Sequence, residues 1–400
     1  MENWQSAWMG AAPLSRRRFS ISPIPGTDMA DILVVGAGQL GLMMAAAGAR
    51  LGISVDRLDH VTGEVLPGTS DTRLPLSREE ILARYPVITV ELEHLLGNEM
   101  VEGLRNESTW CNAEAMSLLP ARDQQKALLE QLDIATSPWQ TIDTPHDLDA
   151  ARLRLGDELV VKSIRDGYDG KGQWVVGSGD DGGIPENAYG GIIAERLIRF
   201  EREVSLVGAR FRGGGKAFFP LVENYHQDGM QRYTLAPASG SEVLQDEAED
   251  MLGRVMDSFD YVGVMAMECF ETRQGLLVNE LAPRVHNSGH WTQAGAGISQ
   301  FDLHLLAILD RPLVELPTRQ GFTLMLNLIG CRLNPEWQGL AGIQCWWYGK
   351  SWRENRKLGH INIHARDPDF LVQVSENLVD TLDPFHGDML NLALGEALPK

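Results

Sequence analysis

The chain has 400 residues, of which 44% are hydrophobic and 22% are charged, and its formal net charge is −20. This length is more than one hydrophobic core usually holds, so we expect a globular protein of two or three domains. The net negative charge argues against nucleic acid and anionic membrane surfaces as partners, because both require a basic face.

Cysteine usage and hydropathy indicate a cytoplasmic protein. The four cysteines are widely spaced and include no C-x-x-C pair (Cys111, Cys269, Cys331 and Cys345). This pattern predicts reduced thiols rather than a disulfide or zinc framework. No apolar run is long enough to span a bilayer, so no membrane partner is expected.

Residues 1–28 differ from the rest of the chain. Ser15-Arg16-Arg17-Arg18-Phe19 is similar to a twin-arginine export signal, but residues 21–28 form no apolar segment behind it. We expect a disordered leader, or an upstream start codon with Met29 as the natural start. A mitochondrial-type transit peptide is the remaining alternative.

The fold is expected to begin at Asp31, in a first domain that covers residues 29–120. A short buried strand at 32–35 is followed by a glycine-rich turn and by a helix that runs to about Leu51. The next strand starts at Ile53. This order predicts a β-α-β unit of a parallel, Rossmann-like sheet.

The glycine-rich turn is Gly36-x-Gly38-x-x-Gly41, with Asp56 and Asp59 about twenty residues further on. Taken alone, this spacing is typical of a dinucleotide site and suggests NAD. The same turn can also hold a phosphate through the amides of a helix N-terminus, or it can be an ordinary tight turn. The sequence leaves these three interpretations open.

The remaining elements predict an α/β protein throughout. Helices are expected at 121–132, 147–155, 242–259 and 300–309, with a helix-capping box at 77–80. Strands are expected at 86–90, 158–162, 173–176, 192–195, 203–207, 217–219, 323–329 and 360–364, and a β-hairpin at 263–278.

A second glycine-rich loop, at 166–172, lies between two predicted strands. Its three glycines allow backbone amides to approach phosphate oxygens closely. Lys171 within the loop and Lys162 before it supply positive charge. The Walker pattern is absent, so a loop that closes over ATP is the better interpretation, with an ordinary flexible turn as the alternative.

The hairpin ends in acids. Alternation along the strands predicts that Glu268 shares a face with Val264 and Ala266, and that Glu280 shares a face with Val278. Two buried carboxylates side by side repel each other unless a cation lies between them. Together with Asn279 they form an oxygen-rich set that suits Mg²⁺. The alternative is a solvated hairpin edge.

Other candidate residues carry weaker signals. Glu195, followed by Arg196-Leu197-Ile198, could present backbone groups to adenine and an acid to ribose. Glu203 and His226 are uninformative when taken alone. Near the end of the chain a basic cluster predicts a phosphate clamp or, alternatively, a solvated patch (Lys350, Arg353, Arg356, Lys357 and His360).

These segments together resemble the ATP-grasp superfamily and, within it, the 5-(carboxyamino)imidazole ribonucleotide synthetases of purine biosynthesis. The resemblance runs from about Asp31 to at least His364. The segments that carry it are 36–41, 166–173, 203–207, 226–229, 279–291 and 356–360.

The resemblance implies an ATP-grasp fold in three parts. A Rossmann-like, parallel-sheet domain would cover residues 29–120, and the ATP-grasp domain residues 121–320, with a lid at about 136–200. A small α/β domain would follow at 321–400. The resemblance also implies a homodimer.

The implied reaction uses ATP and bicarbonate to carboxylate 5-aminoimidazole ribonucleotide, through carboxyphosphate. The cofactor would be Mg²⁺, with Mn²⁺ possible. A different ATP-grasp carboxylase or ligase, an NAD-dependent oxidoreductase and a non-catalytic nucleotide-binding regulator are the alternatives.

The resemblance also assigns site residues. Glu268 and Glu280 would bind the metal. Catalysis would use Arg284, His286, Asn287 and Ser288. The ribonucleotide would contact Gln39, Leu40, Tyr168, Lys350, Arg356 and Lys357, so the first glycine motif would serve the substrate rather than NAD. The ATP site would contain Arg122, Lys162, Asp166, Gly167, Tyr168, Asp169, Gly170, Lys171, Gly172, Glu195, Arg196, Leu197, Ile198, Glu203, His226, Asn279 and Glu280.

Overall fold

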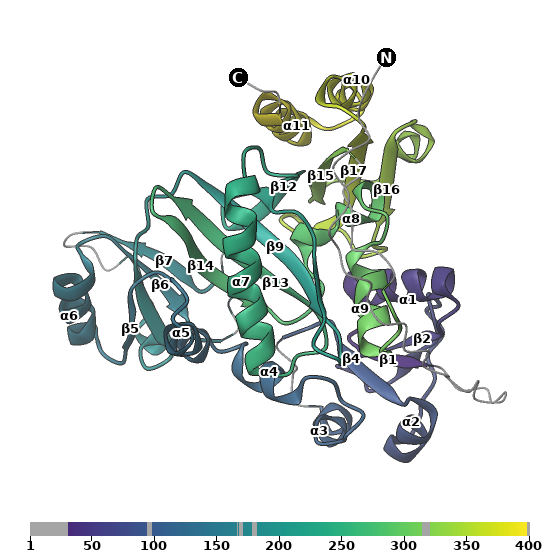
Figure 1. The fold of residues 1–400 in the computed structure, drawn as a ribbon, viewed down its shortest axis with the longest axis horizontal. Helices are drawn as coiled ribbons and strands as arrows, with labels where there is room; N and C mark the ends of the chain where they lie inside the picture. Colours follow the sequence, from purple (N-terminus) through teal and green to yellow (C-terminus); the bar gives the residue numbers. More distant parts are fainter. Residues whose placement is uncertain are drawn as a thin grey trace, which may run out of the picture.

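The computed structural model describes residues 31–93, 98–165, 167, 171–177, 182–313 and 321–397. The predicted leader therefore lies outside the described residues. So do four predicted residues of the second glycine-rich loop: Asp166, Tyr168, Asp169 and Gly170. The described part is mixed α/β and forms three sheets (Figure 1).

The first sheet has the strand order β3-β2-β1-β4. β1 pairs in parallel with β2 and with β4, which confirms the predicted β-α-β unit. The predicted capping box is present as well, with Ser77 opening α2. The bounds are β1 Ile32–Val35, α1 Gln39–Leu51, β2 Val55–Leu58, β3 Val65–Leu66, α2 Arg78–Arg84, β4 Val87–Val90, α3 Glu99–Arg105 and α4 Ala113–Leu118.

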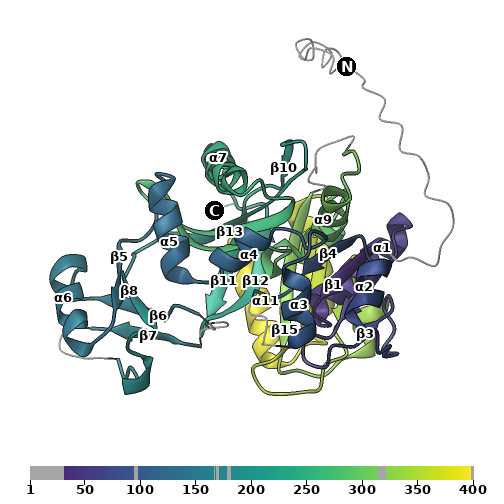
Figure 2. The ribbon, with the colours of Figure 1, turned by 90° about the horizontal axis from the view of Figure 1, so that it is seen from below.

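The second sheet, which we call the lid sheet, has the order β5-β8-β6-β7 and is antiparallel. It lies at one end of the molecule, and the first sheet lies at the other end (Figure 2). The α6 helix packs on it through Leu148, Ala151 and Leu155. The bounds are α5 Arg122–Gln131, β5 Trp139–Ile142, α6 Pro145–Leu155, β6 Leu159–Ser163, β7 Gln173–Val176 and β8 Ile192–Arg196.

The central sheet has the order β14-β13-β9-β11-β12-β15-β17-β16, with β10 paired to β9. Because β12 pairs with β15, the sheet continues from the predicted ATP-grasp domain into the predicted C-terminal domain. The strands are β9 Arg202–Arg210, β10 Lys216–Phe218, β11 Val222–Gln227, β12 Met230–Ala236, β13 Gly263–Thr272, β14 Gly275–Ala282, β15 Phe322–Ile329, β16 Ile343–Trp347 and β17 Lys357–Ala365.

Helices cover the central sheet, and three of them were not predicted: α8, α10 and α11. Of these, α10 and α11 pack Leu371, Leu378 and Leu390 against β15 and β17. β11, β12 and β16 were also missed; in β12 the side chains of Gln231 and Thr234 are polar yet buried. The bounds are α7 Glu242–Ser258, α8 Thr292–Gly295, α9 Gln300–Ile308, α10 Pro368–Val379 and α11 Pro384–Ala397.

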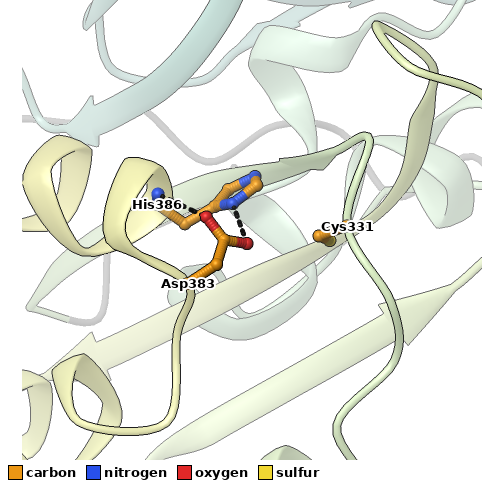
Figure 3. Close-up of side chains that lie close together, drawn as sticks. All are labelled: Cys331, Asp383 and His386. Carbon is orange, nitrogen blue, oxygen red and sulfur yellow. Dashed lines mark hydrogen bonds and ion pairs between the residues drawn. The ribbon is translucent and has the colours of Figure 1, made fainter.

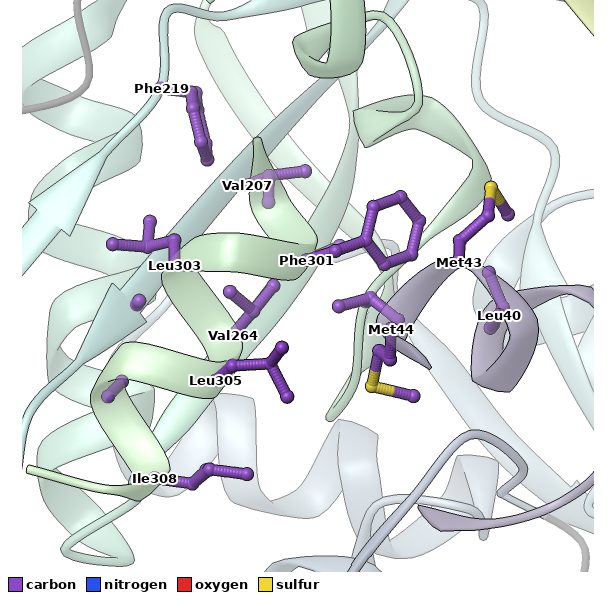
Figure 4. Packing of buried hydrophobic residues seen from close by; sticks show 14 of the residues in the cluster. Leu40, Met43, Met44, Val207, Phe219, Val264, Phe301, Leu303, Leu305 and Ile308 are labelled. Carbon is purple, nitrogen blue, oxygen red and sulfur yellow. The ribbon is translucent and has the colours of Figure 1, made fainter. Parts of the chain in front are cut away.

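An apolar core joins the first sheet to the central sheet. Met43 and Met44 of α1 pack with Phe301 of α9, which itself lies on β9 and β13 (Figure 4). This contact fixes the N-terminus of α1, and so the first glycine motif, beside the central sheet. No described helix combines the length and the low polarity that a membrane crossing requires.

Candidate functional site

The predicted hairpin is present and brings its two acids together. Glu268 of β13 and Glu280 of β14 are direct register partners. After them the register shifts, because Cys269 pairs with Val278 and leaves Asn279 as an extra residue in β14. This bulge places Asn279 beside the acid pair.

The bulge also makes one prediction wrong. Val278 packs with Cys269 in the core beneath α7, whereas Ala282, two residues beyond Glu280, packs in the opposite core with Val264 and Ala266. Val278 and Glu280 therefore lie on opposite faces of the sheet. The extra residue between them reverses the alternation that an unbroken strand would follow.

The acid pair has the electrostatics of a cation site. Burial raises the pKa of Glu268 to about 6; His226 opposes this rise, and the charges of Glu280 and Glu203 add to it. A divalent cation would relieve that repulsion, and carboxylates with an amide oxygen are ligands that Mg²⁺ prefers. The donor set of Glu268, Asn279 and Glu280 therefore fits Mg²⁺.

Two basic residues from outside the hairpin reach the same place. Arg122, at the start of α5, donates to Glu280 Oε2 at 3.1 Å and to the Ser163 carbonyl at 2.9 Å. Lys162 of β6 donates to Asn279 Oδ1 at 2.9 Å. The hairpin thus meets the lid sheet at the C-terminal end of β6.

The glycine-rich loop approaches these groups through its described residues. Arg122 donates to the Gly167 carbonyl at 3.3 Å. A Cβ on Gly167 would lie 2.7 Å from Arg122 Nη1, so a larger residue there would displace the guanidinium. Gly172, with φ +68°, accepts a hydrogen bond from the Ser163 N–H. Lys171 is exposed at the start of the turn into β7.

Glu195 and the residues after it line the seam between the lid sheet and the hairpin. Glu195 is 2% exposed, and its Oε1 lies 3.1 Å from Lys162 Nζ. Arg196 turns away, since its Nε donates to the Leu155 carbonyl. The Leu197 N–H donates to the Glu158 carbonyl. Ile198 comes next in the chain and is half-buried.

Glu203 and His226 lie beside the acid pair because β9 separates β11 from β13. His226 Nδ1 is 2.7 Å from Glu203 Oε2. Burial lowers the pKa of His226, but Glu203 and Glu268 outweigh burial and raise it above its ordinary value. Glu203 and Glu268 therefore favour the protonated form of the imidazole that faces them.

The segment from Arg284 to Ser288 follows the hairpin directly. Arg284 pairs with Glu93 at 2.7 Å. His286 Nδ1 accepts the Ser288 N–H, so the ring proton is on Nε2, 3.8 Å from Glu268. Burial, Arg284 and Lys357 hold the pKa of His286 well below its ordinary value. The Asn287 side-chain nitrogen is buried without a hydrogen-bond partner.

The first glycine motif encloses an internal carboxylate. Glu91, at the end of β4, accepts the N–H groups of Gly38 and Gly41. A Cβ on Gly36, where φ is +122°, would lie 2.1 Å from Glu91 Cγ. Gln39 opens α1 at this turn, with Leu40 next to it.

The second part of the dinucleotide pattern is also used within the fold. Asp56 is buried and accepts hydrogen bonds from the Tyr85 hydroxyl at 2.7 Å and the Gly68 N–H at 2.8 Å. A carboxylate that binds the ribose hydroxyls of NAD would need these oxygens to be unoccupied. The NAD interpretation therefore has no support from this geometry.

The basic cluster near the end of the chain is divided between two places. Lys350 lies 5.4 Å from the centre of the Tyr348 ring, and its charge acts on Glu91. The charge of Lys357 acts on Glu268 and on His286. Arg356 Nη1 donates a hydrogen bond to the Ser351 hydroxyl at 2.7 Å. The cluster therefore spans the space between the first glycine motif and the acid pair.

Sequence reasoning missed several residues of this site. Lys126 and Gln300 are buried polar side chains on predicted helices. The spacing of apolar residues along these helices is ordinary, so nothing nearby in the sequence indicated that either residue belongs to a site. Gln300 holds His286 through the backbone N–H at 2.9 Å and the carbonyl at 2.7 Å. Glu91 and Glu93 had a usable signal, because they follow a parallel strand at its carboxyl end, where ligands commonly bind.

A second group of metal-type ligands lies far along the chain. Within the described residues, Cys331, Asp383 and His386 place their ligand atoms within 4.8 Å of one another (Figure 3). However, the Ile329 N–H donates to His386 Nε2, so Nδ1 carries the proton and donates to Asp383 at 2.8 Å. With both nitrogens engaged, the group acts as a cap that ties α11 to β15 rather than as a metal site.

Comparisons with known proteins show the family to which the chain belongs. The ATP-grasp domain family matches residues 127–301, and the phosphoribosylaminoimidazole carboxylase C-terminal domain family matches residues 323–373. The chain is 40% identical over 365 residues to the N5-carboxyaminoimidazole ribonucleotide synthase of Haemophilus influenzae, covering 91% of this chain and 96% of the relative. It is 41% identical to the Escherichia coli synthase, covering 89% and 96%.

Solved structures of the same kind superpose on the chain. The N5-carboxyaminoimidazole ribonucleotide synthetase of Thermus thermophilus gives a TM-score of 0.77 at 35% identity, covering 88% of this chain and 99% of that one. The Aspergillus clavatus synthase, solved with ADP and 5-aminoimidazole ribonucleotide, gives 0.77 at 25% identity, covering 90% and 99%.

Proposed function

Because the chain belongs to the N5-carboxyaminoimidazole ribonucleotide synthase family of ATP-grasp ligases, we propose how its own residues convert 5-aminoimidazole ribonucleotide to N5-carboxyaminoimidazole ribonucleotide with ATP. The observation that carries the proposal is the meeting of three groups. These are the acid pair of the hairpin, the lysine of the lid sheet and the segment from Arg284 to Ser288.

ATP would bind along the seam between the lid sheet and the hairpin. Lys162 and Arg122 supply positive charge for the phosphates, and Glu195 to Ile198 would border adenine and ribose. Glu203 and His226 would close the far side of the nucleotide site. The loop at 166–172 would cover the phosphates and keep water from a labile intermediate.

Glu268 and Glu280 would hold Mg²⁺, or Mn²⁺ in its place, with Asn279 beside them. When bound, the ion neutralises phosphate charge during phosphoryl transfer. The raised pKa of Glu268 supports this role, because nearby positive charge would stabilise the ionised form that burial and the neighbouring acids oppose.

Bicarbonate would attack the γ-phosphate of ATP to give carboxyphosphate, in the space next to Arg284 and His286. Arg284 places Nη2 on Glu93 and donates from Nη1 to the Val285 carbonyl at 3.0 Å, so its Nε–H, which has no partner among the described residues, would face the anion. His286 would donate from Nε2–H as a neutral imidazole, because Nδ1 accepts from Ser288. Asn287 has a buried amide nitrogen free to donate as well.

The ribonucleotide would lie between the first glycine motif and the basic cluster. Lys350, Arg356 and Lys357 would meet its phosphate, and the turn at Gln39 and Leu40 would border the sugar. Its amine would then face the carboxyl carbon beside Arg284. Tyr168, which belongs to the same prediction, lies outside the described residues.

Three coarser features complete the proposal. The four cysteines are free thiols, as is usual in the cytoplasm, where we place the enzyme. We propose a homodimer, which light scattering after size exclusion would test. The domain divisions at 120/121 and 320/321 stay predictions, and limited proteolysis with mass spectrometry would locate them.

The deciding experiment measures ADP release and N5-carboxyaminoimidazole ribonucleotide formation together. We expect turnover only when ATP, Mg²⁺, bicarbonate and 5-aminoimidazole ribonucleotide are all present. Equal ADP release without the ribonucleotide would refute the substrate assignment. Unchanged turnover in Glu280→Gln would refute the metal site, and Glu114→Gln, an exposed glutamate on α4, is the matched control.

A further inference from the structure

A buried lysine outside the proposed site residues lies behind the nucleotide site. Lys126 projects from α5 and is 1% exposed. Its ammonium group donates to Thr136 Oγ1 at 2.7 Å, to Ser137 Oγ at 2.8 Å and to Glu195 Oε2 at 3.0 Å. A lysine has three N–H donors, and all three are used. Lys126 therefore has no donor left for a ligand and can act only through its partners.

Glu195 connects Lys126 to Lys162. Its Oε2 receives Lys126 and the Ser137 hydroxyl, whereas Oε1 lies 3.1 Å from Lys162 Nζ and receives no hydrogen bond. Lys162 instead donates to Asn279, next to the acid pair. The attraction of Glu195 therefore holds Lys162 in place while its N–H groups remain directed towards the hairpin.

The charges show why two lysines are needed around one carboxylate. Burial raises the pKa of Glu195, but Lys162 and Lys126 together lower it to about 2, so the carboxylate is ionised. Burial lowers the pKa of Lys126 to about 8, against the attraction of Glu195. Without Lys126, the buried carboxylate would keep a single cationic partner and would draw Lys162 towards itself and away from Asn279.

The same cluster is attached to the strand that carries the acids. Thr136, which receives Lys126, donates to the Val278 carbonyl at 2.6 Å. The Val278 N–H in turn donates to the Ala135 carbonyl at 2.8 Å. Lys126 thus links α5, the entry into the lid sheet and β14 at the residue before Asn279.

We propose that Lys126 is a positioning residue for ATP binding. Lys126 holds Glu195, and Glu195 in turn directs Lys162 at the nucleotide phosphates. This inference rests on the proposed function, since Lys162 meets ATP only there. The chemistry needs no direct contact between Lys126 and the nucleotide.

A double-mutant cycle on the full chain tests it, with the affinity for Mg²⁺–ATP measured by titration calorimetry. Lys126→Met and Lys162→Met are each expected to weaken binding roughly tenfold, and the double variant is expected to bind no more weakly than Lys162→Met. In steady state, Lys126→Met should raise the KM for ATP and leave the KM for the ribonucleotide unchanged. Additive losses in the double variant would overturn the inference.

The controls separate the two proposals. Wild-type ATP affinity in Lys162→Met refutes the proposed ATP site itself, whereas wild-type affinity in Lys126→Met beside a weakened Lys162→Met refutes only this inference. Lys216→Met, which breaks a lysine–aspartate pair with Asp257 at 2.6 Å, should bind ATP normally. If Lys126→Met does not fold, Ser137→Ala removes a second hydrogen bond to the same Glu195 oxygen, and a roughly threefold loss is expected.

Discussion

Replacing Glu268 by glutamine should stabilise the protein in the absence of metal while abolishing turnover. Burial beside Glu280 and Glu203 moves the pKa of Glu268 from 4.5 to about 6. The folded protein therefore binds more protons than the unfolded chain between these two values, and its stability falls as the pH rises through that window. At pH 7 this loss of folding stability is complete. Glutamine cannot ionise, so Glu268→Gln does not suffer the loss.

The magnitude follows from the shift. A rise of about 1.5 pKa units corresponds to about 2 kcal/mol at ~1.36 kcal/mol per unit. Because 20% of the Glu268 side chain is exposed, solvent screening reduces the gain to about 1–2 kcal/mol. At pH 4, below both pKa values, Glu268 is already protonated in either state, and the variant should gain nothing.

Urea unfolding without Mg²⁺ at pH 7 and pH 4 measures both values. Adding Mg²⁺–ATP should stabilise the wild-type protein and leave Glu268→Gln nearly unchanged, because the variant lacks one metal ligand. Glu114→Gln is the control and should move neither value. A Glu268→Gln variant that is less stable at pH 7, or equally stabilised at both pH values, would refute the electrostatic reasoning.

Three further predictions concern the first glycine motif, His226 and Arg284. Gly36→Ala forces a side chain against Glu91 at a positive φ and should destabilise the fold by about 2–3 kcal/mol in thermal melting. Glu203→Gln should lower the pKa of His226 in an NMR titration, because it removes a hydrogen bond and a charge that raise it. In the wild type the imidazolium stabilises the fold below pH 6.5, and this contribution is lost as the pH rises through the raised pKa. Arg284→Lys should reduce kcat by roughly 10²-fold with unchanged ATP affinity, since lysine lacks the planar fork.

Each of these has an outcome that contradicts it. A Gly36→Ala protein that melts with the wild type would show that Glu91 moves aside freely, and Gly52→Ala, whose Cβ meets open space, is its control. An unchanged His226 titration in Glu203→Gln would remove Glu203 as the cause of the shift. Lost ATP affinity in Arg284→Lys would place Arg284 in nucleotide binding instead.

The sequence was most informative where a local pattern of residues is compatible with only one type of secondary structure. Val87–Val90 formed a strand as the pattern predicted. The Asn279-Glu280 pair at the end of an apolar run predicted the acid pair, because a strand fixes which residues stand side by side. Where one extra residue broke the alternation, the same rule failed: it placed Val278 on the face of Glu280, and the bulge at Asn279 separated them.

Contacts between distant segments were decided only by the tertiary structure. Nothing near Lys126 in the sequence marks it as the partner of Glu195, 69 residues away, and nothing in the first glycine motif shows that Glu91 fills it. β12 mixes polar and apolar residues, yet all of it is buried, because β11 and β15 flank it in one continuous sheet and α11 packs against it. Periodicity and motif spacing thus indicated the strands, a phosphate-binding loop and the acid pair, since these are local properties, whereas the resemblance implied the reaction. Packing determined which charges meet, because burial strengthens an ion pair only after the fold has removed water from it.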